Sequence, residues 1–281
     1  MPGILFVVAT PIGNLEDVTA RALRILGTVS LIAAEDTRRT AHLLARYAIT
    51  TPTTSFHHHN ETAKAASIIA RLQEGHSVAL VSDAGTPEVS DPGGRLVRSA
   101  IDAGIRVEPI PGPSAVLAAL TASGLTAQSF TFLGFPPTRS KDRKLWFDCL
   151  RTAGRTVVLF ESPHRLKATL EEIRQVVGDC EVAIGREITK IHEEFIRGPI
   201  SSVLLSLSNP IGEFTIVVEI GRTTDQRTRE MTGPAEILVE FGRLIEIDGI
   251  SRRSALQQLA RKFGMTPNQV YMAIETAKKS G

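Results

Sequence analysis

Cysteine and aromatic residues are scarce in this sequence. Two cysteines, Cys149 and Cys180, stand among 281 residues, which is too few for a disulfide framework and is not the spacing of a metal site. Such cysteine usage predicts a reducing, cytoplasmic setting. Aromatic side chains make up 5% of the residues, so the chain has few rings for stacking on unpaired bases. Any nucleic acid that it binds is expected to be recognised by shape and charge.

Long apolar runs are also missing. A transmembrane helix needs about 20 consecutive, mainly apolar residues, and no stretch reaches that length. The opening apolar run at residues 4–9 is short, lacks a basic leader and is closed by Pro11. It therefore predicts a strand and not a signal peptide. We expect no membrane partner.

The common nucleotide-binding motifs do not occur. Neither the G-x-G-x-x-G fingerprint nor a P-loop lysine pattern is present, which argues against nicotinamide and ATP enzymes of the usual types. Three adjacent histidines, His57 to His59, look like metal ligands, but adjacent side chains rarely point at one metal and no Cys or carboxylate partner has the expected spacing. We expect no metal, and a loop at the mouth of a site instead.

What is present is an alternation of short β-rich apolar runs with helical patterns, which predicts a mostly parallel sheet covered on both faces. Strands are expected at residues 4–9, 30–34, 78–81 and 107–110, and helices at 18–26, 37–47, 61–72, 94–103 and 113–122. A second α/β block with a more mixed sheet follows, with helices at 141–150 and 163–177 and strands at 156–160, 181–184 and 214–219.

The domain organisation follows from this pattern and from the length, which exceeds that of most single cores. The prediction is an α/β domain at residues 1–122, a second at 123–224 and a small helical domain at 232–281. Residues 124–140 are expected to connect the α/β domains, and the polar stretch 223–233 to be a linker. Helices are expected at 235–246, 251–263 and 267–278.

The helical tail has helix–turn–helix character and is basic. From Ser251 to the C-terminus it carries one acid, Glu275, against six basic residues: Arg252, Arg253, Arg261, Lys262, Lys278 and Lys279. Contact with RNA or the ribosome, DNA binding through the second helix, and a merely packed helical extension all fit this pattern.

Four elaborate loops follow the predicted strands of the first sheet. They are Thr-Pro-Ile-Gly-Asn-Leu at 10–15, Ala-Glu-Asp-Thr-Arg-Arg at 34–39, Ser-Asp-Ala-Gly-Thr-Pro-Glu-Val-Ser-Asp-Pro-Gly-Gly at 82–94, and Pro-Gly-Pro-Ser-Ala at 111–115. Taken singly, each could merely turn the chain, and Glu35-Asp36-Thr37 could be no more than a helix N-cap. Ligands of such sheets bind beyond the carboxyl ends of the strands, so convergence of four such loops favours a site.

The residue types in these loops limit the classes of ligand that can bind there. They offer small residues, backbone groups and aspartates, with few cations to neutralise a triphosphate. Gly85, Gly93, Gly94 and Gly112 let a ligand approach the main chain where a Cβ would collide. The lining therefore suits a neutral or cationic adenosine-type molecule.

These loops resemble a known family. The stretches VATPIGNLEDVTARA, AAEDTRRT, SDAGTPEVSDPG, PGPSA, LFESPHRL and REITKIHEE, in this order, are similar to those of the tetrapyrrole-methylase-fold enzymes, and within them to the branch that methylates the ribose 2′-hydroxyl of a cytidine in 16S rRNA. The resemblance implies a cleft between two α/β domains, S-adenosylmethionine as donor, a homodimer and the small ribosomal subunit as partner.

The resemblance also implies site residues. Its donor-binding positions correspond here to Pro11, Asp83, Ala84, Gly85, Thr86, Val89, Ser114, Ala115 and Phe160. The wider superfamily has repeated glycines where this chain has Thr-Pro-Ile-Gly-Asn at 10–14, a departure that fits an acceptor other than a tetrapyrrole.

Methyl transfer to a hydroxyl also needs a group that takes the proton. Candidates in the matching motifs are Glu35, Asp36, Glu161, Lys190 and His192. We hypothesise that Glu35 or Asp36 assists deprotonation and that Lys190 is a second choice, as a stabiliser of the oxyanion. The alternative for Lys190 is an ordinary salt bridge to Glu187 or Glu194.

Four arginines are expected to contact phosphates and position the RNA without reading bases: Arg38, Arg39, Arg165 and Arg186. Two rival functions stay open, a methylase of a porphyrin or corrin precursor and a non-catalytic module that binds RNA or the donor.

Overall fold

The structure is a computed structural model, and it describes residues 2–153, 155–208, 210–220, 234–246, 250–263 and 265–280. The chain forms two compact units, Met1–Ile220 and Gly221–Gly281. The linker expected at residues 223–233 lies outside the described residues. Within the described residues, no helix has the length and apolarity to cross a bilayer.

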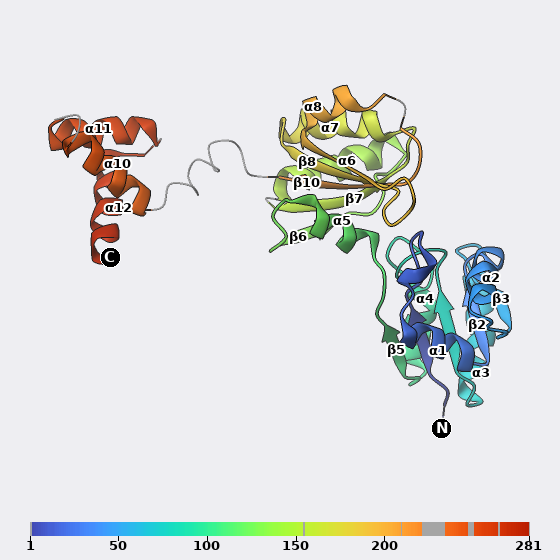
Figure 1. Ribbon diagram of the computed structural model, residues 1–281. Helices are drawn as coiled ribbons and strands as arrows, with labels where there is room; N and C mark the ends of the chain where they lie inside the picture. The colour runs from blue at the N-terminus through green and yellow to red at the C-terminus, as the bar shows by residue number, and fades with distance from the viewer. Residues whose placement is uncertain are drawn as a thin grey trace. The chain divides into compact units, whose positions relative to one another are not determined.

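The first sheet of the larger unit contains five parallel strands in the order β3-β2-β4-β1-β5 (Figure 1). Their bounds are β1 Leu5–Val8, β2 Leu31–Ala34, β3 Thr53–Ser55, β4 Val78–Val81 and β5 Val107–Ile110. Because all five run in the same direction, their carboxyl ends lie at one edge. The loops predicted to form a site all leave the sheet at this edge.

Helices cover both faces of this sheet, as the prediction of a doubly covered sheet requires. They are α1 Ala20–Thr28, α2 Thr37–Arg46, α3 Glu61–Gln73 and α4 Gly94–Asp102. Side chains alternate along a strand, so Phe6 and Val8 pack with α1 and α2, whereas Leu5 packs with α3 and α4. The sheet therefore has a hydrophobic cluster on each side and is held rigidly behind its loops.

The second sheet is mixed, in the order β6-β7-β10-β8-β9. Only β6 and β7 are parallel; the remaining neighbours are antiparallel. Its strands are β6 Phe130–Phe132, β7 Thr156–Glu161, β8 Glu181–Arg186, β9 Glu194–Pro199 and β10 Phe214–Glu219. The helices α6 Ser140–Ala153, α7 Leu166–Val177 and α8 Ile200–Ser206 contribute to the cluster on one face.

The opposite face of the second sheet is covered by α5, Ala115–Ser123. Val116, Ala119 and Leu120 of this helix pack on Val158 of β7 and Val217 of β10. The prediction placed this helix in the first α/β domain, and that placement is wrong. The chain already passes from one sheet to the other at residues 111–114, not at 124–140.

Other parts of the second half also differ from the expectation. The stretch 124–140 contains the edge strand β6, and β9 and α8 were not predicted; in the first half the edge strand β3 was missed. Division of the larger unit into domains at residues 1–122 and 123–224 stays a prediction, whereas the packing of α5 on the second sheet is observed.

The smaller unit consists, in its described part, of α10 Pro234–Glu246, α11 Arg252–Lys262 and α12 Pro267–Ser280. These helices lie where the sequence predicts them. They share a core of Ile237, Phe241, Leu259, Val270 and Ile274. Ser251 caps α11 by accepting a hydrogen bond from Ser254 N at 3.3 Å.

Candidate functional site

A cleft of about 450 Å³ lies within the larger unit. One wall is formed by loops at the carboxyl edge of the first sheet, and the other by the ends of β7 and β10 and the loops beside them. Its lining residues are Ile12, Glu35, Arg39, Asp83, Ala84, Gly85, Thr86, Val89, Ser90, Asp91, Ser114, Ala115, Val116, Phe135, Phe160, Glu161, Ser162, Pro163, Ile188, Gly212, Glu213, Phe214 and Thr215.

The residues expected to bind the donor converge on this cleft, with one exception. Asp83, Ala84, Gly85, Thr86, Val89, Ser114, Ala115 and Phe160 all line it. Pro11 is buried and is not among the lining residues, whereas its neighbour Ile12 is. The structure therefore brings the expected set together without Pro11, and their role in binding stays a prediction.

Reciprocal hydrogen bonds fasten the β2–α2 loop to the β4–α4 loop. The Asp36 backbone N–H donates to Asp83 Oδ1 at 2.9 Å, and the Asp83 N–H donates to Glu35 Oε2 at 3.2 Å. Each carboxylate thus accepts a bond from the other loop. Two loops distant in sequence are held at fixed spacing, which places the Glu35 and Asp83 side chains on one wall.

A second tie joins the β1 and β4 loops. Thr10 and Gly85 form an antiparallel bridge, with Thr10 N donating to Gly85 O at 2.9 Å and Gly85 N donating to Thr10 O at 3.0 Å. Gly85 has a φ of +80°, and its non-glycine neighbours Glu88 and Ser90 have φ of +73° and +70°. Several residues in this loop are therefore held in a left-handed conformation that usually needs support from its surroundings.

The fourth loop supplies the start of α5. Ser114 caps this helix by accepting a hydrogen bond from Leu117 N at 3.5 Å. The first N–H groups of a helix have no partner within the helix and favour an anionic or strongly polar ligand group. Ser114 and Ala115 line the cleft, so this end of it suits a carboxylate.

Acidic side chains dominate the remainder of the first wall. Glu35, Asp83 and Asp91 line it together with one arginine, Arg39. Burial, followed by repulsion from Glu35, raises the pKa of the half-buried Asp91 to about 6. Asp91 was not among the predicted site residues, although it lies in the loop that the sequence singled out. A lining of this charge favours a cation.

The raised pKa of Asp91 predicts a pH-dependent stability difference between the wild type and Asp91→Asn. An unfolded aspartate has a pKa near 3.9, so between about pH 4 and pH 6 the folded state binds more protons and stability falls as the pH rises. Asparagine cannot ionise, so Asp91→Asn should be the more stable form at pH 7.5. This advantage should shrink towards zero near pH 4.

Urea unfolding of both proteins at pH 7.5, 6 and 4.5 measures this difference. The paired comparison cancels the contribution of titrating groups that do not interact with Asp91. A free-energy difference that is the same at all three pH values would contradict the assigned ionisation of Asp91.

The two predicted proton acceptors, Glu35 and Asp36, have different surroundings. Glu35 lines the cleft, whereas Asp36 does not. Asp36 is the N-cap of α2: its Oδ1 accepts bonds from Arg38 N at 2.9 Å and Arg38 Nε at 3.1 Å, and its Oδ2 pairs with Arg38 Nη2 at 2.8 Å. The bonds from the Arg38 side chain and backbone lower the pKa of Asp36 to about 2. These contacts fit the N-cap alternative for Asp36 and leave Glu35 as the stronger candidate.

Lys190 is held by two carboxylates. Its Nζ lies 3.0 Å from Glu187 Oε1 and 2.9 Å from Glu213 Oε2. Burial, the largest single effect, lowers the pKa of Lys190, but the hydrogen bonds to Glu213 and Glu187 together outweigh it and raise that pKa. The lysine is thus a paired cation and a poor proton acceptor; Glu187, and not Glu194, is its partner from the predicted alternative.

The four arginines expected to bind phosphate are distributed differently. Arg39 lines the cleft and lies 3.6 Å from Asp83 Oδ2, and Arg38 is exposed beside Asp36. Arg186 donates to Ile211 O at 2.7 Å and pairs with Glu194 at 3.2 Å. Arg165 is paired with Glu161 at 3.1 Å. The structure therefore does not gather the four on one surface, and only Arg39 reaches the cleft.

Several residues that line the cleft were not predicted from the sequence. Phe135 is one, and it stands in the stretch that was expected to be only a connection. Its ring lies 5.3 Å from that of Phe160 and half of its surface is exposed. Ser162 and Glu213 were also missed, although the LFESPHRL stretch pointed to the first of them.

Within the described residues, the three histidines are not part of a group of side chains that could hold a metal ion. The rings of His57 and His59 lie 6.0 Å apart, and His57 Nε2 contacts Asn60 Nδ2 at 3.2 Å. The position of this loop at the mouth of a site stays a prediction.

Comparisons with known proteins agree with this architecture. Residues 5–204 match the family of tetrapyrrole (corrin/porphyrin) methylases. The chain is 43% identical over 272 residues to "Ribosomal RNA small subunit methyltransferase I" of Synechocystis sp., covering 96% of each chain. It is 48% identical over 219 residues to the Bacillus subtilis protein of the same name, covering 77% of this chain and 75% of that one.

A solved structure has a similar fold. The uroporphyrin-III C-methyltransferase of Thermus thermophilus, complexed with S-adenyl homocysteine, superposes with a TM-score of 0.54 at 18% identity, covering 76% of this chain and 96% of the other. At this identity the likeness shows the fold alone.

Proposed function

This chain belongs to the tetrapyrrole (corrin/porphyrin) methylase family, and from that premise we propose that it is an rRNA methyltransferase that uses S-adenosylmethionine. The finer proposal is methylation of the ribose 2′-hydroxyl of a cytidine in 16S rRNA of the small ribosomal subunit. The observation that supports an rRNA methyltransferase is identity of 43% over 96% of the chain to a relative named "Ribosomal RNA small subunit methyltransferase I". The cytidine ribose is proposed from the resemblance of the loop sequences alone. We also propose a homodimer that works in the cytoplasm.

The cleft fits such a donor. S-adenosylmethionine carries a sulfonium and an ammonium group, which suit a wall lined by Glu35, Asp83 and Asp91. Its carboxylate suits the N-terminus of α5, and its aromatic base suits the rings of Phe135 and Phe160. When bound, the donor supplies a methyl group on a positively charged sulfur.

The contributions of the chain itself are orientation and proton removal. Alignment of acceptor and donor is worth about 7–11 kcal/mol in favourable cases, and the mutually fastened loops at Thr10, Glu35 and Asp83 supply a preformed geometry for it. Glu35 takes the hydroxyl proton directly or through water, a role usually worth about 10²–10⁴-fold. Lys190 stays the second choice, as a stabiliser of the oxyanion: it does not line the cleft itself, but its partner Glu213 does.

Arg39 is the proposed contact to the RNA backbone at the cleft, because it lines the cleft and its side chain is mostly exposed. Arg38, exposed beside it, extends the same basic surface. Such contacts position the RNA without reading its bases.

The experiment is a transfer assay with tritiated S-adenosylmethionine. Small ribosomal subunits from a strain that lacks this protein, free rRNA and uroporphyrinogen are offered separately as acceptors. The proposal expects label on rRNA and none on the tetrapyrrole. Label on uroporphyrinogen alone would replace the proposal with the family's other chemistry, and tight donor binding without transfer to any acceptor would favour a binding module.

A further inference from the structure

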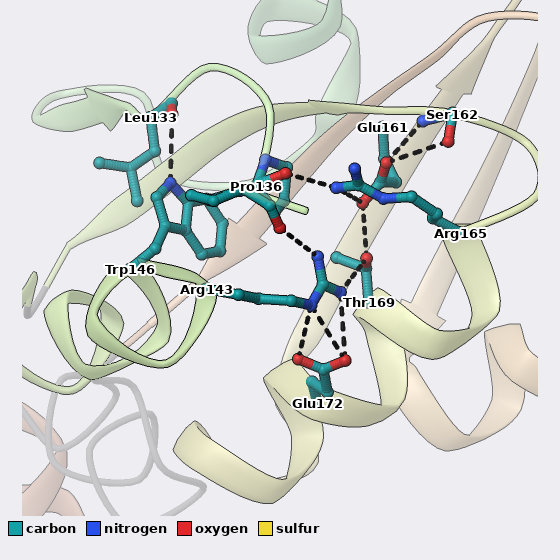
Figure 2. Close-up of polar contacts among 10 residues, drawn as sticks. Leu133, Pro136, Arg143, Trp146, Glu161, Ser162, Arg165, Thr169 and Glu172 are labelled. Atoms are coloured by element: carbon teal, nitrogen blue, oxygen red, sulfur yellow. Dashed lines mark hydrogen bonds and ion pairs between the residues drawn. The ribbon is translucent and has the colours of Figure 1, made fainter. Parts of the chain in front are cut away.

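Glu161, one of the lining residues of the second wall of the cleft, carries a buried carboxylate. The Glu161 side chain, at the end of β7, has no exposed surface, and its two oxygens accept four hydrogen bonds (Figure 2). Oε1 accepts from Ser162 N at 2.7 Å and Ser162 Oγ at 3.3 Å; Oε2 accepts from Thr169 Oγ1 at 2.6 Å and Arg165 Nη2 at 3.1 Å. A buried charge with four donors is anchored firmly.

Arg165 connects this anchor to a second segment of the wall. The Nη2 group that contacts Glu161 also donates to Pro136 O, directly after Phe135 (Figure 2). The pairing between β7 and the segment that follows β6 ends just before this point, with Phe160 N donating to Gly134 O at 3.0 Å. Gly134 has a φ of +63°, so the backbone turns there. After this turn, the hydrogen bond from Arg165 to Pro136 O holds the backbone at the residue that follows Phe135.

An outer layer supports the same segment. Arg143 of α6 donates to Pro137 O at 3.2 Å, to Thr169 Oγ1 at 2.9 Å and to Glu172. Trp146, the one tryptophan of the sequence, donates from Nε1 to Leu133 O at 3.3 Å. Phe135 therefore sits on a segment that is fastened on both sides while half of its own ring remains exposed towards the cleft.

We propose that Arg165 is a positioning residue: it fixes Phe135 against Phe160 and so shapes the donor side of the cleft, instead of binding an RNA phosphate. The inference rests on the proposed function, because it assigns the Phe135–Phe160 wall to the donor. It also corrects the role that the sequence suggested for this arginine.

Two observations separate positioning from the other roles. The Arg165 side chain is 29% exposed and its Nη2 is shared between two acceptors of the chain, so this nitrogen is committed to the protein and not to a phosphate. Its Nε is buried and has no hydrogen-bond partner within the described structure. An unsatisfied buried donor lowers stability, and buried ion pairs are often no more stabilising than apolar replacements. Stability alone therefore does not account for the arginine.

The test compares Arg165→Met and Arg165→Lys with the wild type. Binding of S-adenosylhomocysteine is measured by calorimetry and by the fluorescence of Trp146, which reports on the segment that starts at Leu133. Arg165→Met should weaken binding about tenfold, and Arg165→Lys, which keeps one donor, should weaken it less. The KM for rRNA at saturating donor should not change.

Arg98→Met is the matched control. Arg98 forms the same i,i+4 ion pair with an acid, at 2.5 Å from Asp102, but the pair is on the exposed side of α4 and does not line the cleft. Its loss should leave donor affinity and the Trp146 signal unchanged.

Phe135→Ala gives an independent measurement if Arg165→Met does not fold. It should weaken donor binding to a similar degree. The double variant Phe135→Ala with Arg165→Lys should bind the donor no more weakly than Phe135→Ala alone. Unchanged donor affinity in Arg165→Lys and Phe135→Ala, or a raised KM for rRNA with a shallower salt dependence in Arg165→Lys, would overturn the proposal. Failure of the wild type itself to bind S-adenosylhomocysteine would instead remove the proposed function.

Discussion

Glu35→Gln is expected to lower the rate of methyl transfer by at least about 10²-fold, because glutamine cannot accept the hydroxyl proton. Donor affinity should fall far less than the rate, since glutamine keeps an oxygen that can accept the hydrogen bond from Asp83 N, and Asp83 and Asp91 keep this wall acidic. The measurement is single-turnover transfer of label at saturating donor and rRNA, with calorimetric binding of S-adenosylhomocysteine alongside. The split between rate and affinity distinguishes a proton acceptor from a residue that only holds the loop.

Asp36→Asn is the matched control for Glu35→Gln. Asp36 neighbours Glu35 but caps α2 and pairs with Arg38 outside the cleft. Asparagine is an equally good N-cap, so transfer should proceed at close to the normal rate. A large loss in Asp36→Asn together with normal turnover in Glu35→Gln would exchange the roles of the two acids.

Gly85→Val is expected to weaken donor binding more than tenfold. At its φ of +80° an L-residue is strained, by roughly 1–2 kcal/mol, and the new Cβ would lie 3.4 Å from Ile12 Cγ2 and 3.8 Å from Pro113 O. Both Gly85 and Ile12 line the cleft, so the strain would be relieved by moving this wall. Titration with S-adenosylhomocysteine measures the effect.

Gly104→Val is the control that separates the loss of stability caused by backbone strain from the effect on the shape of the cleft. Gly104 has a similar φ of +68°, follows α4, and would place its Cβ in open space. Both variants should lose stability in urea, but Gly104→Val should bind the donor normally. Equal losses of donor affinity in the two variants would show that global destabilisation, and not the shape of the cleft, is responsible.

Most strands and site-forming loops of the first half of the molecule could be predicted from the sequence. Its strands are short apolar runs, and each is followed by a loop whose glycine, proline and acidic residues have no role in an apolar core. Parallel strands bring such loops to one edge by topology alone. The position of Glu35 and of the Asp83–Thr86 loop on one wall therefore followed from local patterns.

The position of α5 could not be read in this way. Its residues, AVLAALTAS, are apolar on most sides, so the pattern shows that the helix is buried but not which sheet buries it. Strands β6 and β9 were missed for a related reason: both lie at the edges of the second sheet, and neither shows the continuous apolar run of a central strand.

The sequence also could not show which charged side chains pair with one another. The sequence offered Arg165 and Arg186 as phosphate ligands because it shows charge but not what neutralises it. In the structure both are already paired with acids, at Glu161 and Glu194. Asp91 was overlooked because its raised pKa arises from burial and from Glu35, which is distant in sequence.

The position of the transferred methyl group on the rRNA tests the proposed function directly. Small subunits from a strain without this protein are incubated with S-adenosylmethionine that carries a deuterated methyl group, and the rRNA is digested and analysed by mass spectrometry. We expect one labelled cytidine with the label on its ribose, and labelling at least about 10²-fold slower when Glu35→Gln replaces the wild type. Label on a base, or no label in rRNA while uroporphyrinogen is methylated, would contradict the proposed function.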